Sequence, residues 1–148
     1  MHSAVDGFSR LSCTEPLSDE KGATAAAFLA RAKVWFAAHG IFHIHRVLTD
    51  NGACYRSGDF ARIVGNQSRH QRTKPYTPRR NGKVERYQRI LAEELLYARG
   101  FASEDARTAA IAVCNIHYNY HRSHSGASGQ PPASRLQKGV TNVRPSCS

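Results

Sequence analysis

The sequence is poor in cysteine and has no long hydrophobic run. The four cysteines are Cys13, Cys54, Cys114 and Cys147, and no two of them form a Cys-x-x-Cys pair, which argues against a zinc ribbon and against a disulfide framework. No apolar stretch approaches the roughly 18 residues that a membrane-spanning helix needs. No secretory signal peptide is recognisable at the start. These absences predict a soluble protein in a reducing cytoplasm.

Acidic residues are also scarce. Asp and Glu number 11 against 21 for Lys and Arg, which gives a net charge of +10 at pH 7. Such an excess of positive charge favours a polyanionic partner, because each phosphate that a protein neutralises releases counterions. Solvated surface charge alone would explain part of the excess. The 148 residues are enough for one domain with a modest core.

Two acidic residues lie at the ends of expected elements. Residues 42–48 form a short apolar and β-branched run before an Asn-Gly turn, which predicts a strand with Asp50 at its C-terminal end. A second Asn-Gly turn precedes Glu85. Here apolar residues recur at the spacing of a helix face, namely Val84, Tyr87, Leu91 and Leu95. Glu85 is therefore expected in the first turn of a helix.

Two carboxylates placed in this way can converge on one cleft. Mg²⁺ and Mn²⁺ prefer hard oxygen ligands, and two-metal phosphoryl transfer places the ions roughly 3.5–4 Å apart between a few carboxylates. Each feature alone also has a structural explanation. Asp-Asn-Gly is a common turn, and an acidic residue near a helix start stabilises the helix dipole.

Several motifs in a fixed order resemble those of a known family. Thr-Asp-Asn-Gly at residues 49–52 is followed by Pro-Tyr-x-Pro-x-x-Asn-Gly-x-x-Glu-Arg at residues 75–86. Tyr-Asn-Tyr-His-Arg-Ser-His at residues 118–124 and Pro-Pro-Ala-Ser-Arg-Leu at residues 131–136 come next. Together they resemble the catalytic core of bacterial insertion-sequence transposases and retroviral-type integrases, the DDE recombinases. Agreement of several motifs is far more specific than one motif alone.

This resemblance implies a fold, a chemistry and partners. The expected fold is α/β, a ribonuclease-H-like integrase core in which helices flank a mixed β-sheet. Asp50 and Glu85 correspond to the second and third acidic residues of the family's catalytic triad, and they would bind Mg²⁺ or Mn²⁺. The implied activity is metal-dependent phosphodiester transfer in DNA transposition and integration. Its partners would be element ends, target DNA, and further copies of the chain or an intact transposase.

The first acidic residue of the triad is expected to be absent. By resemblance, residues 4–10 form the turn between the family's second and third strands, so Asp6 is not that residue. The strand that carries it would precede Met1. The sequence thus predicts a truncated core over residues 1–136 that lacks its first strand and is inactive alone, and a disordered tail over residues 137–148. The alternative is a non-enzymatic, basic DNA-associating or dimerising remnant that interferes with intact transposase.

Positive charge is densest around the loop and helix that carry Glu85. We expect these basic residues to contact DNA phosphates. The predicted DNA-binding set is Lys74, Arg79, Arg80, Lys83, Arg86, Arg89, His121 and Arg122, the last two by resemblance. A simple helix pair between Glu85 and Arg89 is an alternative for part of the set. The spacing of His117, His121 and His124 is also compatible with zinc.

The other patterns predict the framework of the domain. A helix is expected over residues 19–39, capped by Ser18 or Asp19. A short helix should follow over residues 59–64. By resemblance, the unusually polar residues 66–73 form the next strand. A last helix begins after the cap Ser103, and its apolar stripe is expected to comprise Ala106, Ala109, Ala110, Val113 and Ile116.

Overall fold

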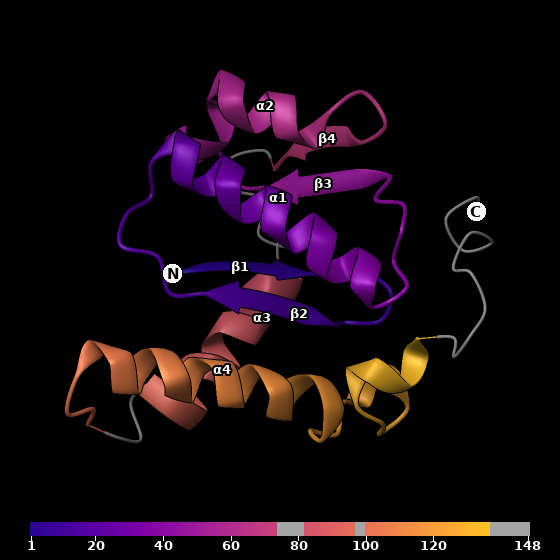
Figure 1. Ribbon diagram of the computed structural model, residues 1–148. Coiled ribbons are helices and arrows are strands. Elements are labelled where there is room, and N and C mark those ends of the chain that lie inside the picture. The colour runs from indigo at the N-terminus through magenta and orange to yellow at the C-terminus, as the bar shows by residue number, and fades with distance from the viewer. Residues whose placement is uncertain (74–81, 97–99, 137–148) are drawn as a thin grey trace. The chain divides into compact units, whose positions relative to one another are not determined.

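The computed structural model (Figure 1) describes three stretches of the chain, residues 1–73, 82–96 and 100–136. The predicted tail over residues 137–148 lies outside the described residues. Contacts divide the chain into two compact units. The first unit joins Met1–Pro16 to Lys83–Leu136, and the second contains Leu17–Gly82. None of the described helices is long and apolar enough to cross a bilayer.

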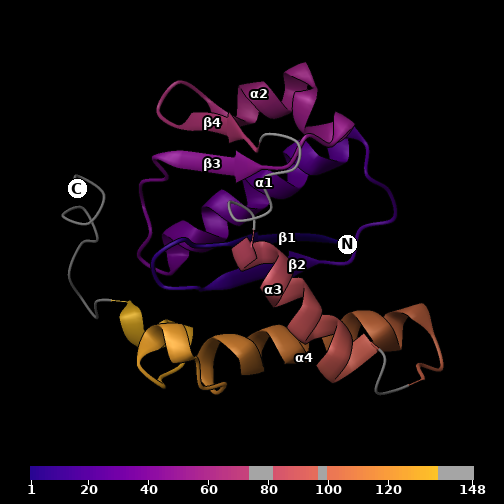
Figure 2. The same cartoon turned by 180° about the vertical axis from the view of Figure 1, so that it is seen from behind.

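The first unit is built on an antiparallel pair of strands. Its main elements are β1 (His2–Val5), β2 (Ser12–Glu15), α3 (Gly82–Leu91) and α4 (Glu104–Tyr120). The two strands pair from His2 opposite Glu15 to Val5 opposite Ser12. Helix α4 packs against β2 (Figure 2). The core of this unit comprises Tyr87, Leu91, Leu95, Ile111 and Tyr118.

The turn between β1 and β2 runs from Asp6 to Leu11. It is closed by hydrogen bonds from the Asp6 N–H to the Leu11 carbonyl and from the Arg10 N–H to the Asp6 carbonyl. Inside it, Oδ2 of Asp6 accepts from the N–H groups of Phe8 and Ser9 and from the Ser9 hydroxyl. Asp6 therefore holds the turn together.

Helix α4 begins where the sequence predicted but buries a different face. Ser103 caps it, and the hydroxyl accepts a hydrogen bond from the Ala106 N–H. The predicted apolar stripe is wrong, because Val113 is 66% exposed and Ile116 is 55% exposed. The buried face instead centres on Ile111, Tyr118 and Asn119. Burial of this polar face is favourable because Asn115 and Asn119 hydrogen-bond to β2.

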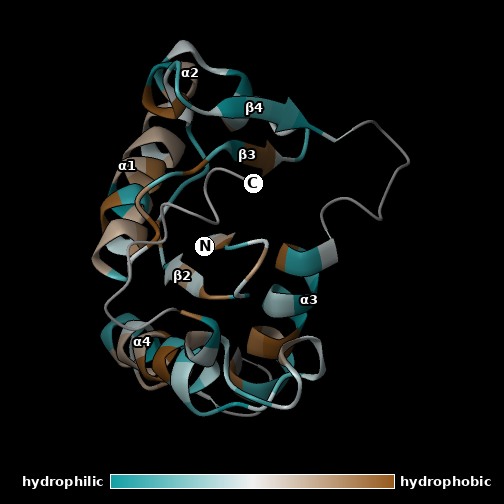
Figure 3. Cartoon of the chain, turned by 90° about the vertical axis from the view of Figure 1, so that its right-hand side faces the viewer, coloured by the Kyte–Doolittle hydropathy of each residue, from teal (hydrophilic) through white to brown (hydrophobic). Residues whose placement is uncertain are grey.

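The second unit is built on a parallel pair of strands. Its main elements are α1 (Gly22–Ala38), β3 (Arg46–Thr49), α2 (Gly58–Val64) and β4 (Arg69–Arg72). β3 and β4 pair from Arg46 opposite Arg69 to Thr49 opposite Arg72. Strand β4 is hydrophilic along its whole length (Figure 3), so backbone pairing rather than apolar burial places it. The described strands thus form two separate pairs, one antiparallel and one parallel, each flanked by helices of its own unit.

Helices α1 and α2 form the core of the second unit. The buried residues are Ala25, Ala26, Leu29, Phe60 and Val64. Close approach requires glycine at position 22, because a Cβ there would lie 2.5 Å from the Cβ of Ser57. The ammonium of Lys33 donates to the carbonyls of Ile63 and Val64, at 2.7 and 2.9 Å. Lys33 thus binds the free carbonyls at the C-terminal end of α2.

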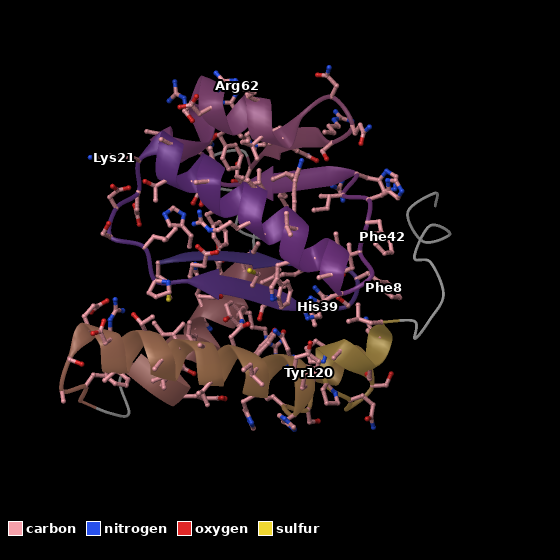
Figure 4. All side chains as sticks on the ribbon, viewed as in Figure 1. Phe8, Lys21, His39, Phe42, Arg62 and Tyr120 are labelled. Atoms are coloured by element: carbon pink, nitrogen blue, oxygen red, sulfur yellow. The ribbon has the colours of Figure 1, made fainter. Side chains whose placement is uncertain are left out.

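Two predicted boundaries in this unit are wrong. Helix α1 starts at Gly22 after Lys21, with no side-chain cap, and the Asp19 carboxylate accepts from the Lys21 N–H instead. Strand β3 starts at Arg46 because its partner β4 is only four residues long. The apolar residues before it are therefore outside the strand, and Phe42 is 55% exposed (Figure 4).

Candidate catalytic and nucleic-acid-binding site

Asp50 follows directly after β3, and its carboxylate is exposed. One oxygen, Oδ1, accepts a hydrogen bond from the Gly52 N–H at 2.7 Å. A Cβ at position 52 would lie 2.9 Å from that oxygen, so the glycine of the Thr-Asp-Asn-Gly motif leaves room for the carboxylate. Asn51 Nδ2 donates to the Thr73 carbonyl at 2.6 Å. The motif therefore fixes the end of the strand and the orientation of Asp50.

A second set of hydrogen bonds holds the backbone of Asp50. The Thr49 hydroxyl donates to the Asp50 carbonyl at 3.0 Å, and Nε2 of His70 lies 3.0 Å from the same hydroxyl oxygen. A hydroxyl has only one proton to donate, so the tautomer of His70 that carries its proton on Nε2 satisfies both contacts of Thr49 at once. Burial first, and then the charge of Arg72, lower the pKa of His70 below 6.5.

Glu85 lies in the first turn of α3, in the first unit, and is exposed. Among the described residues it has no hydrogen-bond or ion-pair partner, so the alternative pairing of Glu85 with Arg89 does not form. An acidic residue at this position is favourable for the helix dipole. Asp50 belongs to the second unit, and the convergence of the two carboxylates stays a prediction.

The donor chemistry of these two residues suits a hard cation. Carboxylate oxygens are preferred ligands of Mg²⁺ and Mn²⁺, and Asp50 and Glu85 are the exposed acids that the motifs single out. The described residues contain no group of three or more His, Cys, Asp or Glu side chains that would hold a metal ion. This finding argues against the zinc alternative. The rings of His117 and His121 stack 6.0 Å apart, whereas His124 packs edge-on against Tyr118 at 4.4 Å.

The predicted DNA-binding residues fall into three groups. Lys74, Arg79 and Arg80 lie outside the described residues. Arg86, Arg89 and His121 are exposed, as phosphate contacts require. The remaining two, Lys83 and Arg122, have partners inside the first unit.

Those two partners change how Lys83 and Arg122 are interpreted. Lys83 Nζ donates to the Gly7 carbonyl at 2.8 Å and so anchors the β1–β2 turn. Arg122 forms an ion pair with Glu94 at 2.7 Å, and their side chains are 29% and 44% exposed. Hydrogen bonding to Glu94 raises the pKa of Arg122. Both cations therefore also have a structural role.

Sequence reasoning missed two further basic residues of the first unit. Arg135 donates to the Phe8 carbonyl at 2.8 Å, and its guanidinium lies 5.4 Å from the centre of the Phe8 ring. Arg10 lies in the β1–β2 turn with a positive φ of 70°. Their positions in the turn and near the C-terminal end gave no signal of proximity, because contacts between distant segments leave no periodic pattern in a sequence.

Comparison with known proteins gives two sequence matches. Residues 66–132 match the family model of the integrase core domain. The chain is 32% identical over 100 residues to an Escherichia coli protein described as the insertion element IS2A uncharacterized 48.2 kDa protein. That match covers 64% of this chain and 23% of the relative, so the chain spans about a quarter of the relative's length.

Solved structures share the fold. The HTLV-2 integrase catalytic core domain, in complex with magnesium in its trimeric form, is 18% identical and superposes with a TM-score of 0.67 over 92% of this chain and 83% of that one. The BIV integrase catalytic core domain is 21% identical and superposes with a TM-score of 0.66 over 90% of this chain and 82% of that one. A chain of a simian T-cell lymphotropic virus intasome, solved in complex with a PP2A regulatory subunit, is 24% identical. It superposes with a TM-score of 0.69 over 92% of this chain and 47% of that one. The motifs, the fold and these matches agree: residues 66–132 match the integrase core domain, and the fold is similar to that of retroviral integrase catalytic cores.

Proposed function

We propose that the chain supplies Asp50 and Glu85 to the metal-binding centre of a DNA transposase. Integrase core domains serve DNA integration and transposition in general. One observation carries the assignment of these two residues. Each is an exposed carboxylate at the end of a regular element, one after β3 and one in the first turn of α3, and neither forms an ion pair within the described residues.

The surrounding residues would hold the carboxylates ready for a cation. The Gly52 N–H uses only Oδ1 of Asp50, which leaves Oδ2 for a metal. Hydrogen bonds through Thr49 and His70 fix the backbone of Asp50. A bound divalent cation would supply Lewis-acid activation of a water or a DNA 3′-hydroxyl. Basic residues on α3 would hold the phosphates of the substrate.

We further propose that these 148 residues do not join DNA by themselves. The family resemblance assigns them only two acids of the triad. Asp6, the acid nearest the start, already accepts three hydrogen bonds within the β1–β2 turn. A carboxylate that bridges two metal ions is needed to align the attacking and leaving oxygens, and Asp6 is committed elsewhere.

Binding of Mn²⁺ to the whole chain, followed by electron paramagnetic resonance, tests this assignment. Asp50→Asn and Glu85→Gln should each weaken binding, and the double variant should be little worse than either, because both would remove the same site. Glu93→Gln, which removes an exposed acid elsewhere on the first unit, is the matched control. Equal Mn²⁺ binding by all four variants would contradict the assignment.

The exposed stripe of α4 favours a second candidate function, self-association through this helix. The stripe comprises Ala106, Ala109, Val113, Ile116 and Tyr120. Their alternating spacing of three and four residues is that of a helix–helix seam. Val113 and Ile116 are mostly exposed, and Tyr120, at the end of α4, is 42% exposed (Figure 4). Exposed apolar stripes of this kind mark protein–protein contacts.

The occupant that fits this stripe best is a second copy of the chain. In an antiparallel pair centred on Val113, the small Ala106 would face the large Tyr120 of the other copy. The acidic first turn, with Glu104 and Asp105, would face the histidine-containing end of the other helix, and the two helix dipoles would oppose each other. Such self-complementarity is what a two-fold interface requires.

A further inference from the structure

Three arginines from distant parts of the sequence gather in the first unit. Arg10 comes from the β1–β2 turn, Arg86 from α3, and Arg122 from the segment after α4. The positive charges of all three lower the pKa of His124, and they oppose the rise that burial causes in the pKa of Tyr118. We call Arg10, Arg86 and Arg122 the arginine cluster.

Contacts between the elements that carry these arginines support this grouping. Nε of Arg10 lies 3.9 Å from where a Cβ of Gly126 would stand, beside the turn that follows His124. The ring of Tyr118 lies 4.4 Å from that of His124 and 4.6 Å from that of Tyr87, the neighbour of Arg86 on α3. The elements that carry the three arginines therefore meet around one aromatic stack.

The backbone of Arg10 is held in one conformation. Its backbone has a φ of 70°, a conformation that side chains rarely adopt unless the surroundings enforce it. Lys83 and Arg135 donate to the carbonyls of Gly7 and Phe8, three and two residues before Arg10. The turn is thus fixed from α3 and from the C-terminal end of the unit, and Arg10 is positioned before any ligand arrives.

Most of the cluster's charge has no acidic partner. Glu94 pairs with Arg122, but neither Arg10 nor Arg86 has an acidic partner among the described residues. Nε2 of His124 is buried without a hydrogen-bond partner. Burial, followed by the charges of Arg122, Arg86 and Arg10, lowers the pKa of His124, and Glu94 opposes this effect. The site therefore has a surplus of positive charge around a neutral imidazole.

We propose that the arginine cluster binds a backbone phosphate of a nucleic acid strand. Guanidinium groups match phosphate oxygens in geometry and form charge-assisted hydrogen bonds with them. The proposal rests on the proposed function, because it assigns a contact to the same DNA substrate. It adds Arg10, and it gives Arg86 and Arg122 a common ligand.

The site is separate from the proposed metal ligand on the same helix. Lys83 contacts the β1–β2 turn, and Arg86 lies three residues further on, at the spacing of one helix face. Glu85 and Arg89 are four residues apart and share the neighbouring face. A phosphate held by the cluster would be a different one from the phosphate at the proposed metal site. Its binding would position the strand.

Binding of the whole chain to a DNA duplex of about 20 base pairs, measured by fluorescence anisotropy across a salt series, tests the proposal. Arg10→Gln should weaken binding and reduce the salt slope by about one, the value of a single phosphate contact. Arg10→Lys keeps the charge and should retain most of the slope. Arg107→Gln, which makes the same change in net charge where Glu104 already pairs with the arginine, is the matched control. Melting temperatures confirm that each variant folds.

The imidazole of His124 provides an independent measurement by nuclear magnetic resonance. Either the duplex or inorganic pyrophosphate should raise the pKa of His124, because an anion offsets the arginine charges. The exposed His43, which belongs to the second unit and lies outside the predicted DNA-binding set, serves as an internal reference in the same spectra. A duplex that binds without shifting His124, and with equal salt slopes for Arg10→Gln and Arg107→Gln, would overturn the proposal while leaving the proposed function intact. A shift with pyrophosphate but no duplex binding would overturn the nucleic-acid assignment and, with it, the proposed function.

Discussion

The carboxamide of Asn119 forms hydrogen bonds with both backbone groups of Ser12. Its Oδ1 accepts from the Ser12 N–H, and its Nδ2 donates to the Ser12 carbonyl, both at 2.8 Å. The side chain therefore occupies the place of a neighbouring strand along the edge of β2. Asn115 continues the network by donating to the hydroxyls of Ser12 and Tyr87, each at 2.9 Å. These contacts connect α4, β2 and α3, the helix that carries Glu85.

Asn119→Ala should destabilise the fold more than the loss of one ordinary hydrogen bond. Both Asn119 and Ser12 are almost completely buried, so the substitution leaves a buried N–H and a buried carbonyl without partners. We expect a loss of about 2–4 kcal/mol in the free energy of unfolding, measured by urea denaturation. Thr108→Ala, at an exposed position of the same helix, should change it by less than about 0.5 kcal/mol. Similar losses in both variants would contradict this role.

Helix α4 shows what the sequence could and could not predict. The Ser103 cap and the helical spacing placed the helix correctly, because both are local signals. Apolar periodicity selected the wrong face, because a pair of asparagines becomes favourable to bury only when a strand edge is present to bond them. The same limit applies to Arg10, whose position beside Gly126 depends on the tertiary fold.

The resemblance to a known family predicted more than the local patterns did. Strand β4 has the sequence Arg-His-Gln-Arg, which no propensity rule would assign to a strand, and the family pattern placed it correctly. The same pattern selected Asp50 and Glu85 from 11 acidic residues. Their roles and their convergence remain predictions, because the two residues lie in separate units.

Gly52→Ala should impair metal binding more than stability. The backbone φ at Gly52 is −51°, which alanine adopts without strain. The added Cβ would nevertheless lie 2.9 Å from Oδ1 of Asp50 and displace the carboxylate. We expect weaker Mn²⁺ binding with a melting temperature close to that of the unchanged chain. Gly58→Ala, where a Cβ would meet nothing within 4 Å, is the control, and unaltered Mn²⁺ binding by Gly52→Ala would refute the prediction.

The stability of the chain should fall as the solution is acidified through the pKa of free histidine. Burial and Arg72 lower the pKa of His70 from 6.5, so the unfolded chain takes up the proton first. The stabilisation is complete above 6.5 and is lost as the pH falls below that value toward the folded pKa. The pKa of His124 is also lowered, so its protonation should likewise reduce the stability of the chain as the pH falls.

A His70→Gln variant separates this contribution. The amide of glutamine can still donate toward Thr49 but does not titrate, so the variant should lose less stability between about pH 8 and about pH 5 than the unchanged chain does. Urea denaturation at each pH measures the difference. His43→Gln removes an exposed histidine as a control. A pH dependence that is the same for both variants would exclude His70 as its source.

Val113→Glu should keep the chain monomeric. A charge at the centre of the exposed stripe would face its own copy across a two-fold axis, and like charges repel. Thr108→Glu adds the same charge at an exposed position outside the stripe. Sedimentation velocity over a range of protein concentrations should therefore show a concentration-dependent dimer for the unchanged chain and for Thr108→Glu, but not for Val113→Glu. Dimers of Val113→Glu would place the interface elsewhere.

Strand transfer by these 148 residues should not exceed that of the Asp50→Asn variant. Two acids can hold one hard cation, with water in the remaining positions, but an in-line displacement across two ions needs a carboxylate that bridges both. The assay uses Mg²⁺ and Mn²⁺ with the terminal repeats of the element that encodes the chain. Activity above that of Asp50→Asn would show that another acid completes the centre. Loss of this activity in Asp6→Asn would identify Asp6 as that acid, and would require its carboxylate to leave the three hydrogen bonds that now hold the β1–β2 turn.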